Sequence, residues 1–97
     1  MKELINSNEK VLVKFGAKWC GPCKIMAVRL GKMKEQGFEQ KHNTLIHEVD
    51  VEEFPELGAE YKIRSMPTFI LFNDGVESKR TMGRRNISDF EKMVSDG

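Results

Sequence analysis

Residues 11–24 read VLVKFGAKWCGPCK: a run of five residues that includes two β-branched valines, then two cysteines with Gly-Pro between them. The run from Val11 to Phe15 has apolar side chains at successive positions, which is typical of a strand covered on both faces, as in a parallel sheet. Pro22 suits the first turn of a helix, where its missing N–H would have no partner in any case. These residues therefore predict a strand, a short loop that carries the cysteines, and a helix that begins beside them.

The spacing of apolar residues predicts how that helix packs and where it ends. The residues that share one helical face, three or four positions apart, are Cys23, Met26, Leu30 and Met33. We expect the two methionines to fill the core, because an unbranched thioether side chain adapts to irregular gaps. Gly37 suits the end of the helix.

The remaining pattern predicts three more strands and further helices. A strand over 45–51 would complete a parallel strand–helix–strand unit. Asn86 can cap a last helix, since Asp89 follows three residues later, and apolar residues at 87, 90 and 94 would form its buried side. The other expected elements are a short helix over 54–61, an apolar strand over 68–72, a turn at 73–75 and an antiparallel strand over 76–82. The sum is an α/β fold, one mixed sheet with helices on both faces.

Length and composition limit the classes of protein that fit. A chain of 97 residues with 39% hydrophobic and 32% charged residues is expected to form a single globular domain over 1–97. The net charge of +1 gives no field that attracts nucleic acid or a membrane surface, and no apolar run reaches the ~18 residues of a spanning helix. The first ten residues contain no apolar signal region, so the expected location is the cytoplasm.

The two cysteines lie three positions apart at the expected start of the helix. A helix N-terminus carries about half a positive charge and free N–H groups, so we expect a lowered pKa for the Cys20 thiol and an attacking role for its sulfur. Cys23, one turn along the helix, can reach that sulfur and resolve a mixed disulfide. Pro22 stiffens the loop, and Trp19 offers a flat apolar surface beside the nucleophile. The pattern indicates thiol–disulfide chemistry.

Two simpler interpretations of the cysteine pair are less favoured. A C-x-x-C pair is also half of a zinc site, but zinc needs four ligands, and only His42 and His47 could supply the others. A purely structural disulfide is disfavoured further, because a loop of four residues restrains little of the unfolded chain. We therefore expect no bound metal.

Several segments of the sequence are similar to the thioredoxin family. Residues 15–24, FGAKWCGPCK, closely resemble its active-site segment, and residues 61–69, YKIRSMPTF, are similar to the segment around its cis-proline. Residues 73–75 fall at the family's hairpin turn, and Gly83 falls at the glycine beside its substrate groove. The resemblance covers about Lys10 to Val94, so the chain is identified as a member of this family with a thioredoxin-like fold.

The resemblance implies a role for each matching residue. Cys20 would be the nucleophile and Cys23 the resolving cysteine of a redox-active disulfide. A cis peptide bond between Met66 and Pro67 would set the Met66 backbone beside the dithiol, ready to pair with an extended substrate strand. The residues implied to support the active site or to line a shallow substrate groove are Trp19, Gly21, Pro22, Lys24, Met66, Pro67, Gly83 and Arg84.

The resemblance also implies partners for a general disulfide reductase. No cofactor is expected to be bound; electrons would come from NADPH through a separate thioredoxin reductase, and the substrates would be proteins that contain disulfides. The chain is expected to be a monomer. Arg84 and Arg85, at the edge of the groove, are most simply a solvated pair of charges, and alternatively favour acidic partners through the association rate.

The sequence departs from the family at Lys14 and Glu48. Thioredoxins usually have a buried aspartate at the first position, beneath the resolving cysteine, and a lysine at the second. Because an unpaired buried charge costs several kcal/mol, the exchange suggests an inverted buried pair near Cys23. Glu48 would then accept the Cys23 proton, and Lys14 would stabilise the thiolate. Alternatively, Lys14 extends to the rim and Glu48 is merely solvated.

Three further departures bear on the fold. Gly16 stands where a tryptophan is common, which alters the packing expected around the active site. Val28 stands where a helix-kinking proline is common, so we expect a straighter helix. Nine residues precede Lys10, enough for a turn or two of helix around Leu4 and Ile5. We therefore expect four strands rather than five, with one edge less covered.

Two other functions fit the same motif. An oxidase or isomerase would use the same chemistry, but Gly21-Pro22 between the cysteines resembles the reducing members of the family more than the Cys-Gly-His-Cys and Cys-Pro-His-Cys types. Alternatively, the chain is a non-redox docking subunit of a larger complex and uses the groove only as a binding surface.

Overall fold

Helices and strands follow one another in the order that the apolar pattern predicts, with one helix added. The structure is a computed structural model that describes residues 1–95. Its strands are β1 (Lys10–Gly16), β2 (Leu45–Asp50), β3 (Thr68–Asn73) and β4 (Val76–Met82). Its helices are α1 (Lys2–Ser7), α2 (Gly21–Glu35), α3 (Phe38–His42), α4 (Pro55–Glu60) and α5 (Ile87–Ser95). The predicted elements are confirmed to within two residues at either end.

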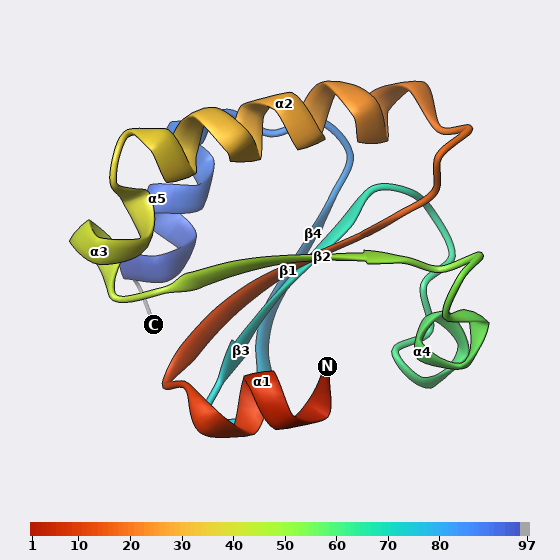
Figure 1. The fold of residues 1–97 in the computed structure, drawn as a ribbon, viewed down its shortest axis with the longest axis horizontal. Helices are drawn as coiled ribbons and strands as arrows, with labels where there is room; N and C mark the ends of the chain where they lie inside the picture. The colour runs from red at the N-terminus through yellow and green to blue at the C-terminus, as the bar shows by residue number, and fades with distance from the viewer. Residues whose placement is uncertain (96–97) are drawn as a thin grey trace.

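The four strands form one mixed sheet in the order β2-β1-β3-β4 (Figure 1). β1 and β2 are parallel, and the chain crosses between them through α2 and α3, whereas β3 is antiparallel to both β1 and β4. β1 is therefore an inner strand, which explains why the run from Val11 to Phe15 is buried on both faces. The register places Lys14 opposite Glu48 of β2.

Helices cover both faces of the sheet, as the sequence predicts (Figure 1). Alternate residues of a strand face opposite sides, so Leu12 of β1 enters one core while Val13 enters the other. The core under α2, α3 and α5 consists of Leu12, Met26, Leu30, Met33, Phe38, Ile46, Phe69, Leu71, Phe90, Met93 and Val94. The core under α1 and α4 consists of Ile5, Val11, Val13, Phe15, Val49, Ile70 and Phe72. The two methionines of α2 are core residues, as predicted.

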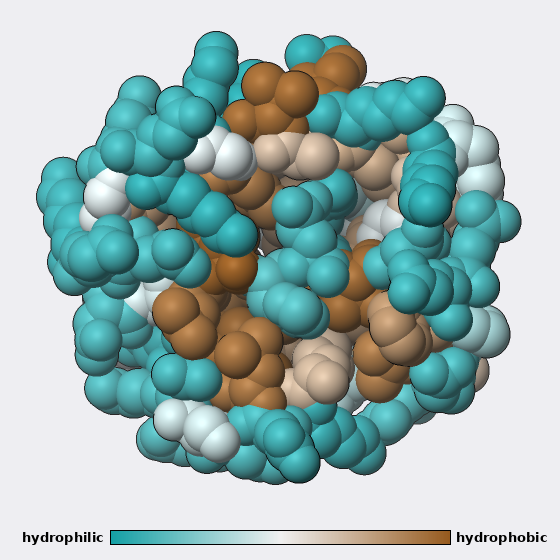
Figure 2. Space-filling model, viewed as in Figure 1, coloured by the Kyte–Doolittle hydropathy of each residue, from teal (hydrophilic) through white to brown (hydrophobic). Residues whose placement is uncertain are grey.

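The face that carries α1 and α4 is covered more thinly than the other. Ile5 is the buried residue of α1, and every residue of α4 is at least partly exposed. Figure 2 shows hydrophobic side chains (brown) that reach the surface in the lower half of the view, over the region between these two helices. The residues that pack half-buried against this core are Met1, Leu4, Leu45, Val51, Leu57, Tyr61 and Ile63.

The last hairpin and the last helix are fixed by local backbone chemistry. Asp74 (φ 51°) and Gly75 (φ 84°) both adopt the left-handed conformation, which two-residue hairpin turns require. At the start of α5, the Asp89 carboxylate accepts a hydrogen bond from the Asn86 N–H at 2.8 Å. Both features match the predicted turn and the predicted helix start.

Helix α3 is the element that the sequence analysis does not predict. Gly37 follows the end of α2 with φ 81°, but the chain coils again at once over Phe38–His42. Phe38 enters the core, and its ring centroid lies 4.4 Å from that of His42. α2 itself continues without a break through the exposed Val28 (Figure 1).

Within residues 1–95, no helix is both long enough and apolar enough to cross a lipid bilayer.

Candidate redox site

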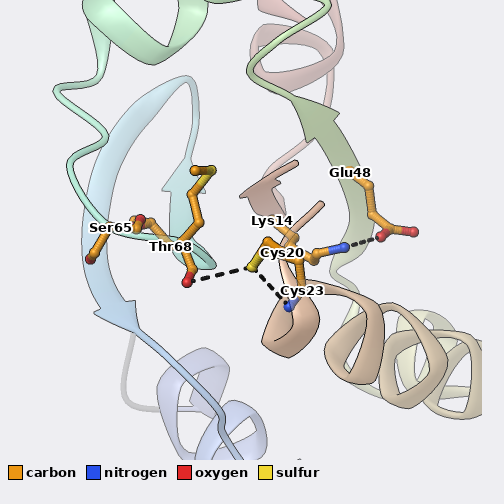
Figure 3. Close-up of a disulfide and its surroundings, with 7 residues drawn as sticks. Lys14, Cys20, Cys23, Glu48, Ser65 and Thr68 are labelled. Atoms are coloured by element: carbon orange, nitrogen blue, oxygen red, sulfur yellow. Dashed lines mark hydrogen bonds and ion pairs between the residues drawn. A yellow bond between two sulfur atoms is a disulfide. The ribbon is translucent and has the colours of Figure 1, made fainter. Parts of the chain in front are cut away.

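The two cysteines form a disulfide at the N-terminal end of α2 (Figure 3). β1 ends at Gly16, and the Cys20 N–H then donates to the Ala17 carbonyl oxygen at 3.2 Å, which turns the chain into the helix. Cys20 is the N-cap residue, and its Sγ accepts a hydrogen bond from the Cys23 N–H at 3.1 Å. The opening turn of the helix is therefore directed at this sulfur, a geometry that stabilises a thiolate. The predicted pairing of the cysteines is confirmed.

The segment before β3 lies directly against Cys20. The Cys20 Sγ is 3.7 Å from the Met66 carbonyl oxygen, a contact rather than a hydrogen bond because the oxidised sulfur carries no proton (Figure 3). The Met66–Pro67 peptide bond is cis, as the family resemblance implies. The Gly83 N–H donates to the Pro67 carbonyl oxygen at 2.8 Å, and the Thr68 hydroxyl donates to the Ser65 carbonyl oxygen at 2.7 Å. Four of the predicted site residues therefore meet at one place.

The other predicted site residues lie on the surface around the cysteines. Both cysteines are buried, whereas the Trp19 side chain on the same loop is 64% exposed. The predicted residues that are likewise exposed are Gly21, Pro22, Lys24 and Arg84. Within residues 1–95, no hydrogen bond joins Trp19 or Arg84 to the disulfide. An exposed aromatic ring beside a buried disulfide leaves an apolar surface on which another protein can rest.

Lys14 and Glu48 form the ion pair that the sequence predicts, 2.7 Å between Nζ and Oε1. Adjacent parallel strands place the two residues opposite each other, and Figure 3 shows the Lys14 ammonium group directed at Glu48 on β2. The Lys14 side chain is 9% exposed and that of Glu48 is 44% exposed. The pair is therefore buried at its cationic end and open to solvent at its anionic end.

Gly16 connects this ion pair to the disulfide. A Cβ atom at this position would lie 2.9 Å from the Cys23 Sγ and 3.4 Å from the Lys14 Cε, so both side chains press against the glycine. A cavity of about 380 Å³ opens beside them, on the Cys23 side of the disulfide. Its walls are Lys14, Gly16, Ala17, Lys18, Cys23, Lys24, Ala27, Glu48, Val49, Asp50, Glu53 and Phe54. Solvent can thus approach the ion pair next to the buried cysteine.

The sequence analysis did not select Asp50, Glu53 or Phe54 as site residues. Asp50 ends β2, Glu53 and Phe54 follow it at the edge of the cavity, and no motif marks any of the three. One signal was present: the carboxyl end of β2 lies beside that of the parallel strand β1, which leads into the cysteines.

The histidines considered as zinc ligands lie elsewhere in the fold. His42 ends α3 and its Nε2 is 3.6 Å from a Glu91 carboxylate oxygen, while His47 lies on β2. Among the described residues, no group of three or more His, Cys, Asp or Glu side chains is arranged to hold a metal ion.

Comparison with known proteins places this cysteine pair in a family: the family model described as Thioredoxin matches residues 1–96. The chain belongs to the thioredoxin family. The thioredoxin of Mycoplasmoides gallisepticum is 41% identical over 83 residues, which cover 86% of this chain and 79% of that relative. The bifunctional thioredoxin reductase/thioredoxin of Mycobacterium leprae is 37% identical over 94 residues, which cover 97% of this chain and 20% of that protein. The oxidised form of mitochondrial thioredoxin 3 from Saccharomyces cerevisiae superposes with a TM-score of 0.82 at 34% identity, covering 99% of this chain and 86% of that one.

Membership of the thioredoxin family, together with the bonded cysteine pair, makes this chain a thiol–disulfide oxidoreductase. The thioredoxin-like fold predicted from the sequence is confirmed as well, with its mixed four-stranded sheet between two layers of helices.

Proposed function

We propose that this thioredoxin reduces disulfide bonds in other proteins, with Cys20 as the attacking and Cys23 as the resolving cysteine. The observation that carries the proposal is the Cys20–Cys23 disulfide at the opening turn of α2, with the Cys20 sulfur beside the Met66 carbonyl. The Cys23 sulfur faces inward, against Gly16. The chain would act as a monomer of one domain, in the cytoplasm.

The reaction consists of two exchanges between thiolates and disulfides. The Cys20 thiolate attacks one sulfur of the target disulfide; that bond breaks, and the other target sulfur leaves as a thiolate that takes up a proton. The Cys23 thiol then loses its proton and attacks the Cys20 sulfur, which releases the second target thiol. Two electrons have passed to the target, and the enzyme holds the Cys20–Cys23 disulfide.

The groove beside Cys20 supports an extended segment of the target as substrate. The Met66 backbone lies within contact of the reacting sulfur, and the half-buried Gly83 beside it is hydrogen-bonded to the buried Pro67. A target strand laid along Met66 would bring its disulfide onto the Cys20 sulfur by backbone pairing. Trp19 on one side and Arg84 on the other would flank it, while Gly21, Pro22 and Lys24 form the adjoining turn of α2.

The ion pair supplies a proton acceptor for the second exchange. Glu48 is exposed at the cavity beside Cys23 and can take the thiol proton through water in that cavity. Lys14, buried at the other end of the pair, places a positive charge near the sulfur as it becomes a thiolate. The usual aspartate of the family would thus be replaced by a carboxylate on the neighbouring strand.

The electrons that restore the dithiol would come from NADPH through a separate thioredoxin reductase. Support comes from the Mycobacterium leprae relative, whose name joins a thioredoxin reductase to a thioredoxin in one chain. No bound cofactor of its own is needed, because the two sulfurs store both electrons.

The proposed function is tested by following reduction of insulin with NADPH and a thioredoxin reductase, and in parallel with dithiothreitol as the donor. We expect turnover by the native chain, none by Cys20→Ser, and a trapped mixed disulfide with Cys23→Ser. Turnover that survives Cys20→Ser would overturn the assignment of the nucleophile. An inactive native chain in both assays would favour the docking function instead.

The role of Glu48 is tested by the Glu48→Gln variant, which keeps the shape of the side chain and removes its charge. We expect the resolution of the mixed disulfide to slow by about tenfold at neutral pH, a modest loss of general-base catalysis because the site is open to water. Asp50→Asn, in the same cavity wall, is the matched control and should keep the native rate. An unchanged pH–rate profile in Glu48→Gln would remove the proposed role.

A further inference from the structure

Charge is distributed unevenly around the disulfide. On the Cys23 side, the cavity wall contains three carboxylates, and three lysines of the same wall balance their charge; these residues are Glu48, Asp50, Glu53, Lys14, Lys18 and Lys24. On the Cys20 side, the two loops beside the groove carry arginines instead, Arg64 before Met66 and Arg84 after Gly83. A target that lies along the groove would therefore meet positive charge on the Cys20 side.

Hydrogen bonds hold the two arginine-bearing loops together next to the reacting sulfur. The Gly83 N–H donates to the Pro67 carbonyl oxygen at 2.8 Å, and the Ser65 hydroxyl lies 3.1 Å from the Met82 sulfur. Arg64 is thus two residues from the carbonyl that contacts Cys20, and Arg84 is one residue from the bond to Pro67. Both arginines therefore lie on the joined loops that form one rim of the groove.

The charges of these two arginines are not neutralised by the part of the chain that the structure describes. Both residues are exposed, and neither has a carboxylate oxygen within 4.0 Å among residues 1–95. Arg80 on β4 differs, because two of its nitrogens bond to Glu77. Arg85 also follows Gly83, but it shares a cavity wall with Asp89, so the inference does not depend on it.

We propose that Arg64 and Arg84 select target disulfides that are flanked by acidic residues. The inference rests on the proposed function and names its substrate class: protein segments with aspartate or glutamate next to the target cysteine. The exposed guanidinium groups attract such segments before contact and orient them along Met66. Because solvent-exposed charges act mainly on encounter, the selection shows in the association rate and weakens with salt.

The test uses three disulfide-bonded peptides that differ only in the two residues beside the cysteine: Glu, Gln or Lys. Each rate is divided by the rate for the same peptide with dithiothreitol, because flanking charge also alters the reactivity of the disulfide itself. At about 20 mM ionic strength, where the screening length is about 20 Å, we expect kcat/KM to be about fivefold higher for the Glu than for the Gln peptide. At about 0.5 M the screening length falls to about 4 Å, and the three values should converge.

Charge-reversal variants test whether Arg64 and Arg84 cause the preference for acidic peptides. Arg64→Glu combined with Arg84→Glu should reverse the order, so that the Lys peptide reacts faster than the Glu peptide. Lys32→Glu combined with Lys92→Glu changes the net charge equally; both lysines are exposed on α2 and α5, away from the groove, and this variant should keep the native order.

The outcomes separate the inference from the proposed function. Reduction of all three peptides at one normalised rate, or an equal effect of the two double variants, would overturn the selection and leave the reductase intact. Failure to reduce even the Gln peptide would contradict the reductase itself.

Discussion

At the scale of single residues, Gly16 packs directly against the redox centre. The Cβ of any other residue would lie 2.9 Å from the Cys23 Sγ and 3.3 Å from its Cβ, closer than side chains normally pack. In the disulfide, the Cys23 sulfur is tied to Cys20 and cannot turn away. In the dithiol, the same side chain is free to rotate to another staggered position. A methyl group at residue 16 should therefore destabilise the oxidised form more than the reduced form.

The Gly16→Ala variant tests this difference. Overpacking a core costs about 1–3 kcal/mol. The redox equilibrium changes only by the difference between the cost to the oxidised form and the cost to the reduced form. We expect the equilibrium with glutathione to move about tenfold toward the dithiol, which is a potential about 30 mV higher. The change can be followed by the fluorescence of Trp19, the single tryptophan, which lies next to Cys20.

Gly31→Ala is the matched control for this substitution. It lies in the same helix as the cysteines, and no atom lies within 4 Å of the Cβ that it would gain. Replacing an exposed helical glycine should stabilise both redox forms by about 0.5–1 kcal/mol and leave the potential unchanged. A potential that moves equally in both variants would show that Gly16 has no special contact with the disulfide.

The redox site was predictable partly from spacing and partly from the family resemblance. The disulfide follows from two cysteines at one helical turn, whereas the Lys14–Glu48 pair was inferred from the exchange of two charges that thioredoxins usually have at these positions, and the strand register bears it out. The exposure of Glu48 was not predictable, because it depends on β2 being the edge strand. The contact of Gly16 with Cys23 was also missed, since a glycine has no side chain to suggest a partner.

At the scale of elements, edge strand β2 carries a titratable group on its thinly covered face. His47 shares a face with Leu45 and Val49, which belong to the core under α1 and α4. Burial there lowers the pKa of His47, and the N-terminal amino group and Lys34 lower it further, while Glu48 acts in the opposite direction. The folded chain therefore binds a proton at His47 less readily than the unfolded chain does.

This difference fixes the sign of a pH effect on stability. Below the unfolded pKa of about 6.5, the unfolded state holds more protons at residue 47, so acid favours unfolding. Relative to His47→Gln, the native chain should lose stability as the pH falls from about 7 to 5. Above that range, the free energies of unfolding of the native chain and the variant should change with pH in parallel. Urea unfolding midpoints at several pH values measure this. Parallel curves across the whole range would show that burial of His47 does not affect its protonation.

Two elements show where apolar periodicity is sufficient to predict a helix or strand and where it is not. The strand over 76–82 was predicted with its observed bounds because a turn with two left-handed residues, Asp74 and Gly75, fixes its start. Helix α3 was missed because five residues give too few apolar positions for a period to be read. Gly37 was predicted to end a helix, and in the structure it lies between α2 and the start of α3.

At the scale of the whole molecule, the sheet separates two cores, and the helix that carries the redox site packs on one of them, while the cysteines form a small cluster of their own at its start. α2 begins with both cysteines and supplies Met26, Leu30 and Met33 to the core beneath it. α1 lies on the opposite face and contributes Ile5 to the other core (Figure 1). A thermodynamic cycle links stability to redox potential: the potential changes only if a substitution destabilises the oxidised and reduced forms by different amounts.

Ile5→Ala should therefore weaken the fold without changing the redox potential. Ile5 is 2% exposed, and truncating such a side chain costs about 2–4 kcal/mol in transfer and cavity terms. Because the lost contacts lie across the sheet from the disulfide, the oxidised and reduced forms should lose the same free energy of unfolding in urea. Gly16→Ala supplies the contrast, since its cost falls mainly on the oxidised form. A shift of more than about 10 mV in Ile5→Ala, equivalent to about 0.5 kcal/mol for two electrons, would show instead that the sheet transmits packing changes from one core to the cysteines.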